Sequence, residues 1–435
     1  MKFFSKDSLW ILCSNVVKLI FGFLIVPIIG RSVLPEQLGK IDLLLAYGPF
    51  INQLISLGLT NSNTKFYKEN EDINVIKYMQ SKIWMRSVLF TTMFFIFFSL
   101  FSAKEIGLPI LIIGLYSISI LLENICFLPQ NQLLNSNQFQ QYSIYNTLST
   151  IIRHSLTLLL VVVMTDKLLA LSIGLLISNL YLFFVNIRIY KDLLFCFTSE
   201  NLISEGLIQN IKKYSLPLFF LGSVGILYQS SDRLLLAYFT NDNMTQIGYL
   251  GMAQRIIGML SVGLSGLFTV WGVKAFENYS DEILMKEKEK LIKMMLLVLI
   301  TSLVGMFFLK TFIINFILTT SYADAFPICV LLIGIFVNNR IREILEKYFL
   351  RKGKSRFISA LYVGFSVFSV IGSALFLYYF SLEEMLMFRL LVTFLHSVIL
   401  FLILHINKQK INPVWLGFNF LMTIVVIISV KLQLF

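Results

Sequence analysis

The chain has 435 residues, of which 57% are hydrophobic and only 14% are charged, and its formal net charge is +12. Soluble domains carry roughly 25% charged residues, so this composition, with a mean hydropathy of +0.80, excludes an ordinary water-soluble protein. The basic residues lie mostly in short loops between apolar runs, a pattern typical of membrane topology. We therefore expect no nucleic-acid partner.

A membrane-spanning helix needs ~20 mainly apolar residues, and such runs follow one another along the whole sequence. They predict an all-α polytopic membrane protein with twelve transmembrane helices in two six-helix lobes. A further run at 414–432 is a candidate extra C-terminal helix. The twelve predicted spans lie at 8–30, 41–60, 83–102, 106–128, 142–164, 167–188, 213–239, 246–272, 292–310, 324–348, 357–380 and 385–405.

The loop charges predict the orientation of these helices. With the N-terminus in the cytoplasm, most loop Lys and Arg residues fall on the cytoplasmic side, as the positive-inside rule requires. We expect a multi-pass protein of the bacterial inner (plasma) membrane. The outer loops are too short to fold as a domain. The four cysteines form no CxxC pair and the three histidines lie far apart, so we expect no disulfide, no metal site and no cofactor.

The longest predicted connection lies at the midpoint of the twelve spans. Within it, apolar residues from Leu202 to Ile211 recur at helical spacing, which predicts an amphipathic helix on the membrane surface. We therefore divide the chain into an N-terminal lobe (1–190), a cytoplasmic amphipathic linker (191–212), a C-terminal lobe (213–407) and a C-terminal apolar segment (408–435).

Two short correspondences suggest that the lobes are repeats. The second helix of each lobe opens on similar residues, Gln37-Leu38-Gly39 and Gln246-Ile247-Gly248. The fourth and fifth helices of each lobe are joined by a polar hinge, at 134–138 and 350–354. Together they favour a duplicated transporter that binds its substrate between the two halves.

Charged residues inside the predicted spans are costly in lipid and usually face the protein interior or a wet cavity. Here the cations outnumber the anions, which suggests an anionic ligand such as a pyrophosphate, because Arg and Lys bind phosphate oxygens strongly. The candidate substrate-binding cations are Lys18, Arg153, Arg233 and Arg255. The candidates for ion coupling, or for structural ion pairs, are Asp42, Glu123 and Asp232.

Structural roles for some of these charges stay open. Asp42 and Arg389 lie near span ends and could reach the membrane interface, and Arg153 could pair with Glu123 on a neighbouring helix.

Asp232 and Arg233 point ~100° apart on one helix, so one of them could serve an ion pair, with Arg255 as a candidate partner of Asp232. Lys18 lies mid-span and no acidic residue follows Asp7 in its helix, which favours a place in a cavity.

Three features carry a family resemblance: Val26-Pro27 through Leu34-Pro35-Glu36-Gln37-Leu38-Gly39; Ser231-Asp232-Arg233 through Phe239, followed by Ile247-Gly248-Tyr249; and the twelve-span layout. In these the chain resembles the polysaccharide transporter family of the multidrug/oligosaccharidyl-lipid/polysaccharide exporter superfamily, and the O-antigen flippases in particular.

The resemblance implies a transporter rather than an enzyme. It would flip undecaprenyl-pyrophosphate-linked O-antigen or related oligosaccharide units by alternating access, for surface polysaccharide and lipopolysaccharide biosynthesis. The implied partners are this lipid-linked oligosaccharide, membrane lipids and other polysaccharide-assembly proteins. Related flippases place cations in helices 1, 2 and 8. Lys18 and Arg255 lie in comparable helices, whereas Lys40 is only at the mouth of helix 2.

Two alternative functions remain. A multidrug or small-molecule antiporter of the same superfamily usually keeps an acidic residue in helix 1, where this chain has Lys18. A membrane sugar polymerase or glycosyltransferase typically places its catalytic residues on a sizeable outer loop, for which the predicted loops are too short.

Overall fold

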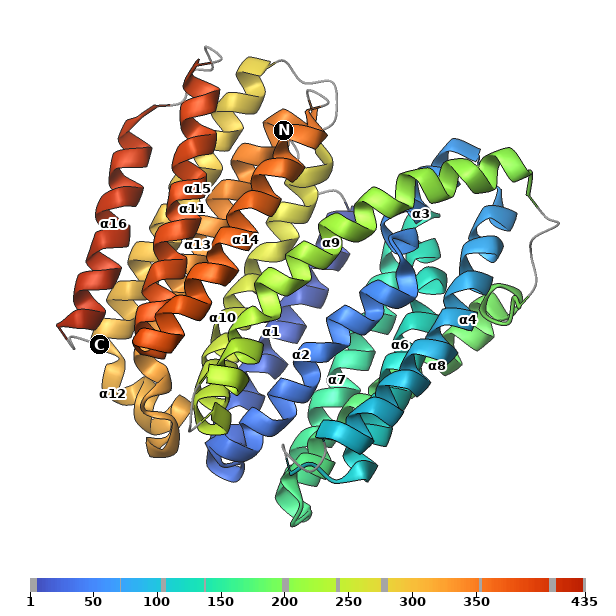
Figure 1. Ribbon diagram of the computed structural model, residues 1–435, viewed down its shortest axis with the longest axis horizontal. Coiled ribbons are helices and arrows are strands. Elements are labelled where there is room, and N and C mark those ends of the chain that lie inside the picture. Colours follow the sequence, from blue (N-terminus) through green and yellow to red (C-terminus); the bar gives the residue numbers. More distant parts are fainter. Residues whose placement is uncertain are drawn as a thin grey trace. The chain divides into compact units, whose positions relative to one another are not determined.

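The structure is a computed structural model that describes residues 6–70, 72–102, 107–136, 138–197, 203–239, 243–274, 281–351, 354–406 and 412–432. Within these ranges the regular secondary structure is entirely helical (Figure 1). Nine of the described helices are long and apolar enough to cross a membrane. The prediction of an all-α polytopic membrane protein is confirmed.

The elements of the first half begin with α1 and end with α8. They are α1 (Lys6–Ser32), α2 (Pro35–Ser56), α3 (Leu59–Asn70), α4 (Ile73–Phe97), the π-helical turn η1 (Phe98–Ser102), α6 (Ile110–Asn135), α7 (Phe139–Val163) and α8 (Lys167–Leu194).

The second half contains six long helices that match those of the first half, and one more. Its elements are α9 (Glu205–Phe239), α10 (Asn243–Lys274), α11 (Asp281–Phe308), α12 (Lys310–Phe312), the short turns η3 (Ile313–Leu318) and η4 (Thr320–Tyr322), α13 (Ala325–Arg351), α14 (Ser355–Tyr379), α15 (Leu382–Ile406) and α16 (Val414–Lys431).

The contacts divide the chain into two compact units. The N-terminal unit comprises Met1–Ile25 and Lys40–Ser230, and the C-terminal unit comprises Val26–Gly39 and Ser231–Phe435. The turn between α1 and α2 therefore packs with the second half of the chain. Helices α1, α2 and α9 each contribute residues to both units.

The same packing pattern occurs in each unit. In the N-terminal unit α6 packs against α4 and α8, and α7 packs against α8; in the C-terminal unit α13 packs against α11 and α15, and α14 packs against α15. Within each unit, the helices that pack against one another lie side by side in Figure 1. This correspondence agrees with an internal repeat, and it makes α6 and α13 the central helices of their units.

The amphipathic segment of the midpoint connection does not form a helix of its own. Helix α9 runs without interruption from Glu205 to Phe239, so the amphipathic segment and the seventh predicted span form one helix. Ile211 is buried, whereas Lys212 and Lys213 are exposed, as an amphipathic segment requires. Residues 198–202 of the predicted linker lie outside the described residues.

The second predicted span also divides at an unforeseen place. Helix α2 ends at Ser56, and Leu57 and Gly58 adopt positive φ angles of 43° and 78° before α3 begins. A Cβ on Gly58 would overlap the carbonyl oxygen of Ser215 on α9. Glycine thus permits both the left-handed turn and the close approach of α9.

The C-terminal apolar segment forms α16, which packs against α13 and α15. Its Asn419 amide donates a hydrogen bond to Asn338 Oδ1 on α13 at 2.9 Å, and the Asn338 amide reaches Thr423 Oγ1 on α16 at 3.4 Å. Helix α16 is also long and apolar enough to cross a membrane. It is therefore a packed element of the C-terminal unit.

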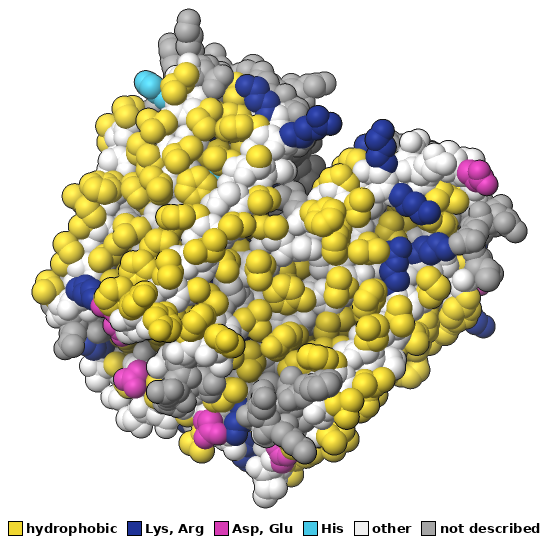
Figure 2. All heavy atoms as spheres, viewed as in Figure 1, with side chains coloured by type: hydrophobic (Ala, Val, Ile, Leu, Met, Phe, Trp, Pro, Cys, Tyr) yellow, Lys and Arg dark blue, Asp and Glu magenta, His cyan; other side chains and the backbone are white. Residues whose placement is uncertain are grey.

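The surface agrees with a lipid environment. On the face drawn in Figure 2, hydrophobic side chains cover a broad area and charged side chains are few. Large apolar side chains such as Val163, Phe308 and Phe184 are more than half exposed. Such a surface is stable only against hydrocarbon.

Candidate functional site

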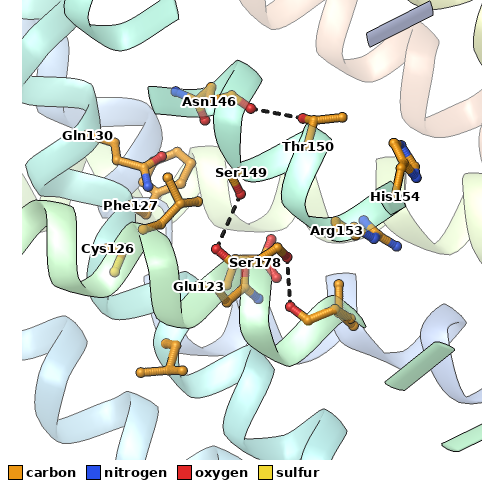
Figure 3. A pocket seen from close by; sticks show the side chains of 14 residues that line it. Glu123, Cys126, Phe127, Gln130, Asn146, Ser149, Thr150, Arg153, His154 and Ser178 are labelled. Atoms are coloured by element: carbon orange, nitrogen blue, oxygen red, sulfur yellow. Dashed lines mark hydrogen bonds between the residues drawn. The ribbon is translucent and has the colours of Figure 1, made fainter. Parts of the chain in front are cut away.

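The N-terminal unit contains a polar cavity of about 280 Å³ between α6, α7 and α8. Figure 3 shows its labelled side chains: Glu123 and Gln130 point into it from α6, and Asn146, Ser149 and Arg153 come from α7. Polar cavities inside a membrane protein are costly and commonly mark a site of function. We therefore take this cavity as the candidate site.

Glu123 and Arg153 bring opposite charges to the cavity. Both side chains are exposed to its open space, although α6 is packed between α4 and α8. Glu123 on α6 and Arg153 on α7 line the same cavity, and Asn52 on α2 lines an adjoining cavity together with Glu123. The structure thus brings together the two residues named as a possible pair, and their pairing stays a prediction.

A second cavity of about 230 Å³ adjoins the first and shares Glu123 and Phe127 with it. Its other polar lining comes from α2, α3 and α6 and includes Asn52, Gln53 and Asn124. The Asn124 amide donates to Asn52 Oδ1 at 2.7 Å. This hydrogen bond thus joins α6 and α2 on the wall of the cavity that Glu123 also lines.

Hydrogen bonds also hold the lining of the first cavity in place. The Asn146 amide donates to the Tyr142 carbonyl at 2.9 Å, and the Asn179 amide donates to Ser119 Oγ at 2.7 Å. Ser149 Oγ donates to the Ser178 carbonyl at 3.3 Å (Figure 3). These bonds hold polar side chains in fixed positions on the cavity wall.

The remaining candidates of the N-terminal unit lie outside this cavity lining. Lys18 is half-buried on α1. Asp42 on α2 is only 2% exposed, so its side chain is buried among the helices. Sequence position near a span end did not reveal this burial, because it depends on the helices that pack around α2.

In the C-terminal unit, Asp232 on α9 forms a buried ion pair with Arg389 on α15. The partner is therefore Arg389 rather than Arg255, and the Arg389 side chain is buried, with 4% exposure. Arg233 donates a hydrogen bond to Gln254 Oε1 on α10. Arg255 is half-buried on the same helix.

A second buried charge cluster in the C-terminal unit was not among the sequence candidates. Arg342 and Glu346 on α13 approach to 3.3 Å, and His396 on α15 lies 3.8 Å from Glu346. The His396 ring stacks on Phe365 at a centroid distance of 4.3 Å. The four-residue spacing of Arg342 and Glu346 on one helix was the available signal for part of this cluster.

No group of three or more His, Cys, Asp or Glu side chains could hold a metal ion within the described ranges. The candidate site accordingly offers hydrogen bonds and one pair of opposite charges. It can bind and release a polar ligand or a proton.

Comparison with protein families finds one matching family model, described as polysaccharide biosynthesis protein, over residues 4–272. No curated protein matches the chain. The family match covers more than half of the sequence, including every helix that contributes to the candidate cavity.

Similarity to solved structures extends over nearly the whole chain. The chain is similar to a structure titled "Lipid II flippase MurJ, inward closed conformation", with a TM-score of 0.71 and 15% identity, covering 98% of this chain and 97% of that one. It is also similar to an inward-facing multidrug resistance MATE family transporter, with a TM-score of 0.69 and 13% identity over 91% and 94% of the two chains. At such identities the likeness shows the fold alone.

Proposed function

This chain belongs to the polysaccharide biosynthesis protein family, and from that premise we propose that it is a lipid-linked oligosaccharide flippase. It moves undecaprenyl-pyrophosphate-linked O-antigen or related oligosaccharide units across the bacterial inner membrane by alternating access. The family match over residues 4–272 is the observation that carries this proposal. The fold shared with a lipid II flippase supports it.

The proposed roles follow the charges. Lys18, Arg233 and Arg255 attract the anionic pyrophosphate, because guanidinium and ammonium groups bind phosphate oxygens. The fourth candidate cation, Arg153, lines the cavity that Glu123 also lines. Among the acidic candidates, Glu123 is best suited to couple transport to an ion gradient, since its carboxylate faces a cavity. Asp232 is less suited because Arg389 already neutralises it.

The proposed topology places the N-terminus in the cytoplasm, as the distribution of Lys and Arg in the loops favours. In this proposal the lipid-linked sugar is assembled on the cytoplasmic leaflet and enters the transporter from that side. It leaves on the opposite side of the membrane. Other polysaccharide-assembly proteins are its proposed neighbours in the membrane.

The test is complementation of cells that lack the gene. Lys18→Ala and Arg255→Ala should each abolish display of surface polysaccharide, measured by antibody or lectin binding to intact cells, while the variant reaches the membrane at a normal level. Lys212→Ala is the matched control, because Lys212 is a solvent-exposed basic residue on α9. Full display with both cavity variants would contradict the cationic substrate site.

A multidrug antiporter is the second candidate, because the fold is also that of MATE transporters. The same cells decide between the two. A flippase restores surface polysaccharide and leaves resistance to cationic drugs unchanged, whereas an antiporter raises drug resistance without restoring display. A sugar polymerase or glycosyltransferase has less support, since neither the family nor the fold neighbours point to catalysis.

A further inference from the structure

The cavities of the N-terminal unit have the chemistry of a site for an uncharged ligand rich in hydroxyl groups. Amides and hydroxyls from α2, α3, α6, α7 and α8 supply most of the polar groups of their lining. In the larger cavity, Asn146 and Asn179 donate to protein atoms through their amide nitrogens. Each of these amides also carries an oxygen with two lone pairs, so the lining includes groups that can accept hydrogen bonds from a ligand.

The charges of the larger cavity argue against a charged ligand. A pyrophosphate would meet the Glu123 carboxylate and only one guanidinium, that of Arg153. A cationic drug would meet Arg153 beside the one carboxylate. Opposite charges that line the same cavity cancel most of the field on a distant charge, but each can still form strong hydrogen bonds with neutral hydroxyls.

Size and apolar surface agree with a sugar ring. About 280 Å³ and about 230 Å³ are just below the ~300–1,000 Å³ typical of pockets for drug-sized molecules, so each cavity has room for a ring-sized group. Phe127 lies where the two cavities meet and its side chain is 41% exposed. The electron-rich face of an aromatic ring attracts the slightly positive C–H groups of a sugar.

We propose that these two adjoining cavities bind individual uncharged sugar residues of the transported glycolipid. Glu123, Asn146 and Asn179 accept hydrogen bonds from sugar hydroxyls, Arg153 donates to a hydroxyl or ring oxygen, and Phe127 packs against a sugar face. This inference rests on the proposed flippase function and assigns the sugar and the pyrophosphate to different residues. The N-terminal unit thereby contributes to selection of the sugar.

The experiment measures binding of two lipids to the full-length protein in lipid nanodiscs. One probe is undecaprenyl pyrophosphate, and the other is the pyrophosphate-linked glycolipid extracted from cells that lack the gene. The wild type should bind the glycolipid at least tenfold more tightly than the bare carrier. Asn146→Ala and Glu123→Gln should remove most of that preference, about three- to tenfold each, and leave affinity for the bare carrier unchanged.

Asn186→Ala is the matched control. Its amide donates to the carbonyl four residues earlier, as that of Asn146 does, but Asn186 lines neither cavity. This variant should keep the full preference. Glu123→Gln also separates binding from structure: a purely structural Glu123 would lower thermal stability and leave the preference intact.

Equal binding of the two lipids by the wild type would overturn the sugar site and leave the flippase proposal standing. So would a loss in Asn146→Ala that is the same for both lipids. If the wild type binds neither lipid, the flippase proposal itself fails and the sugar site fails with it. The three patterns are therefore distinguishable.

Discussion

Gly39 on α2 and Gly248 on α10 pack against each other's helices in a reciprocal contact within the C-terminal unit. A Cβ on Gly39 would overlap the Met244 carbonyl oxygen, and a Cβ on Gly248 would overlap the Pro35 carbonyl oxygen. Each glycine thus meets the carbonyl of the residue four positions before the other glycine. These are the two positions that correspond in the proposed repeat, and small residues allow such close helix approach in membranes.

Gly39→Ala should destabilise the protein by about 1–3 kcal/mol, because the new methyl group overpacks a contact between two backbones. Thermal unfolding of the purified protein in detergent measures the loss. Gly258→Ala on α10 is the control, since nothing lies within 4 Å of its Cβ position. That variant should be neutral or slightly stabilising, because alanine favours a helix more than glycine does. Equal effects of the two substitutions would contradict the reciprocal contact.

Arg389→Met should destabilise the protein by about 3–5 kcal/mol, because it leaves the buried Asp232 carboxylate without its partner. Combining it with Asp232→Asn should recover much of the loss, since no uncompensated charge then remains. A double-mutant cycle on detergent-unfolding temperatures and membrane yield gives the coupling. Strictly additive single losses would show that the two residues do not act as a pair.

Substitutions in the Arg342–Glu346–His396 cluster should lower thermal stability by unequal amounts. Glu346→Leu should lower thermal stability markedly, because it removes the partner of the Arg342 guanidinium. His396→Phe should be much milder, since a phenyl ring can keep the stacking on Phe365. Both variants are compared by unfolding temperature in the same detergent. A larger loss in His396→Phe than in Glu346→Leu would reverse this ranking and refute it.

Asn419→Leu should loosen α16 and cost about 1–2 kcal/mol, the range for hydrogen bonds between membrane helices, because it removes the donor to Asn338 Oδ1. Unfolding temperature and proteolysis of the segment before α16 both report this change. Leu421→Ala on the same helix serves as the reference, since Leu421 is 56% exposed. If the two variants behave alike, α16 is held by apolar contact alone.

The partners of the buried charged residues were the feature that the sequence predicted least well. A mid-span Glu and a mid-span Arg on neighbouring helices, Glu123 and Arg153, were recognisable as candidates for a pair because their depth in the membrane limited the choice of partners. Asp232 had two arginines near it in sequence, and its actual partner Arg389 comes from a helix far along the chain. Helix packing selected that partner.

The helical membrane character, nearly every long helix and the membership of the polysaccharide biosynthesis protein family could be predicted from the residues alone. Those properties depend on hydropathy and on short motifs, which act locally or over one span. Three features became visible only in the folded chain. The α1–α2 turn belongs to the C-terminal unit, and α9 is one continuous helix. Polar groups of α2, α6, α7 and α8 line two adjoining cavities. The reason is geometric: such sites need side chains from several helices, and their rotation about each helix axis is set by packing.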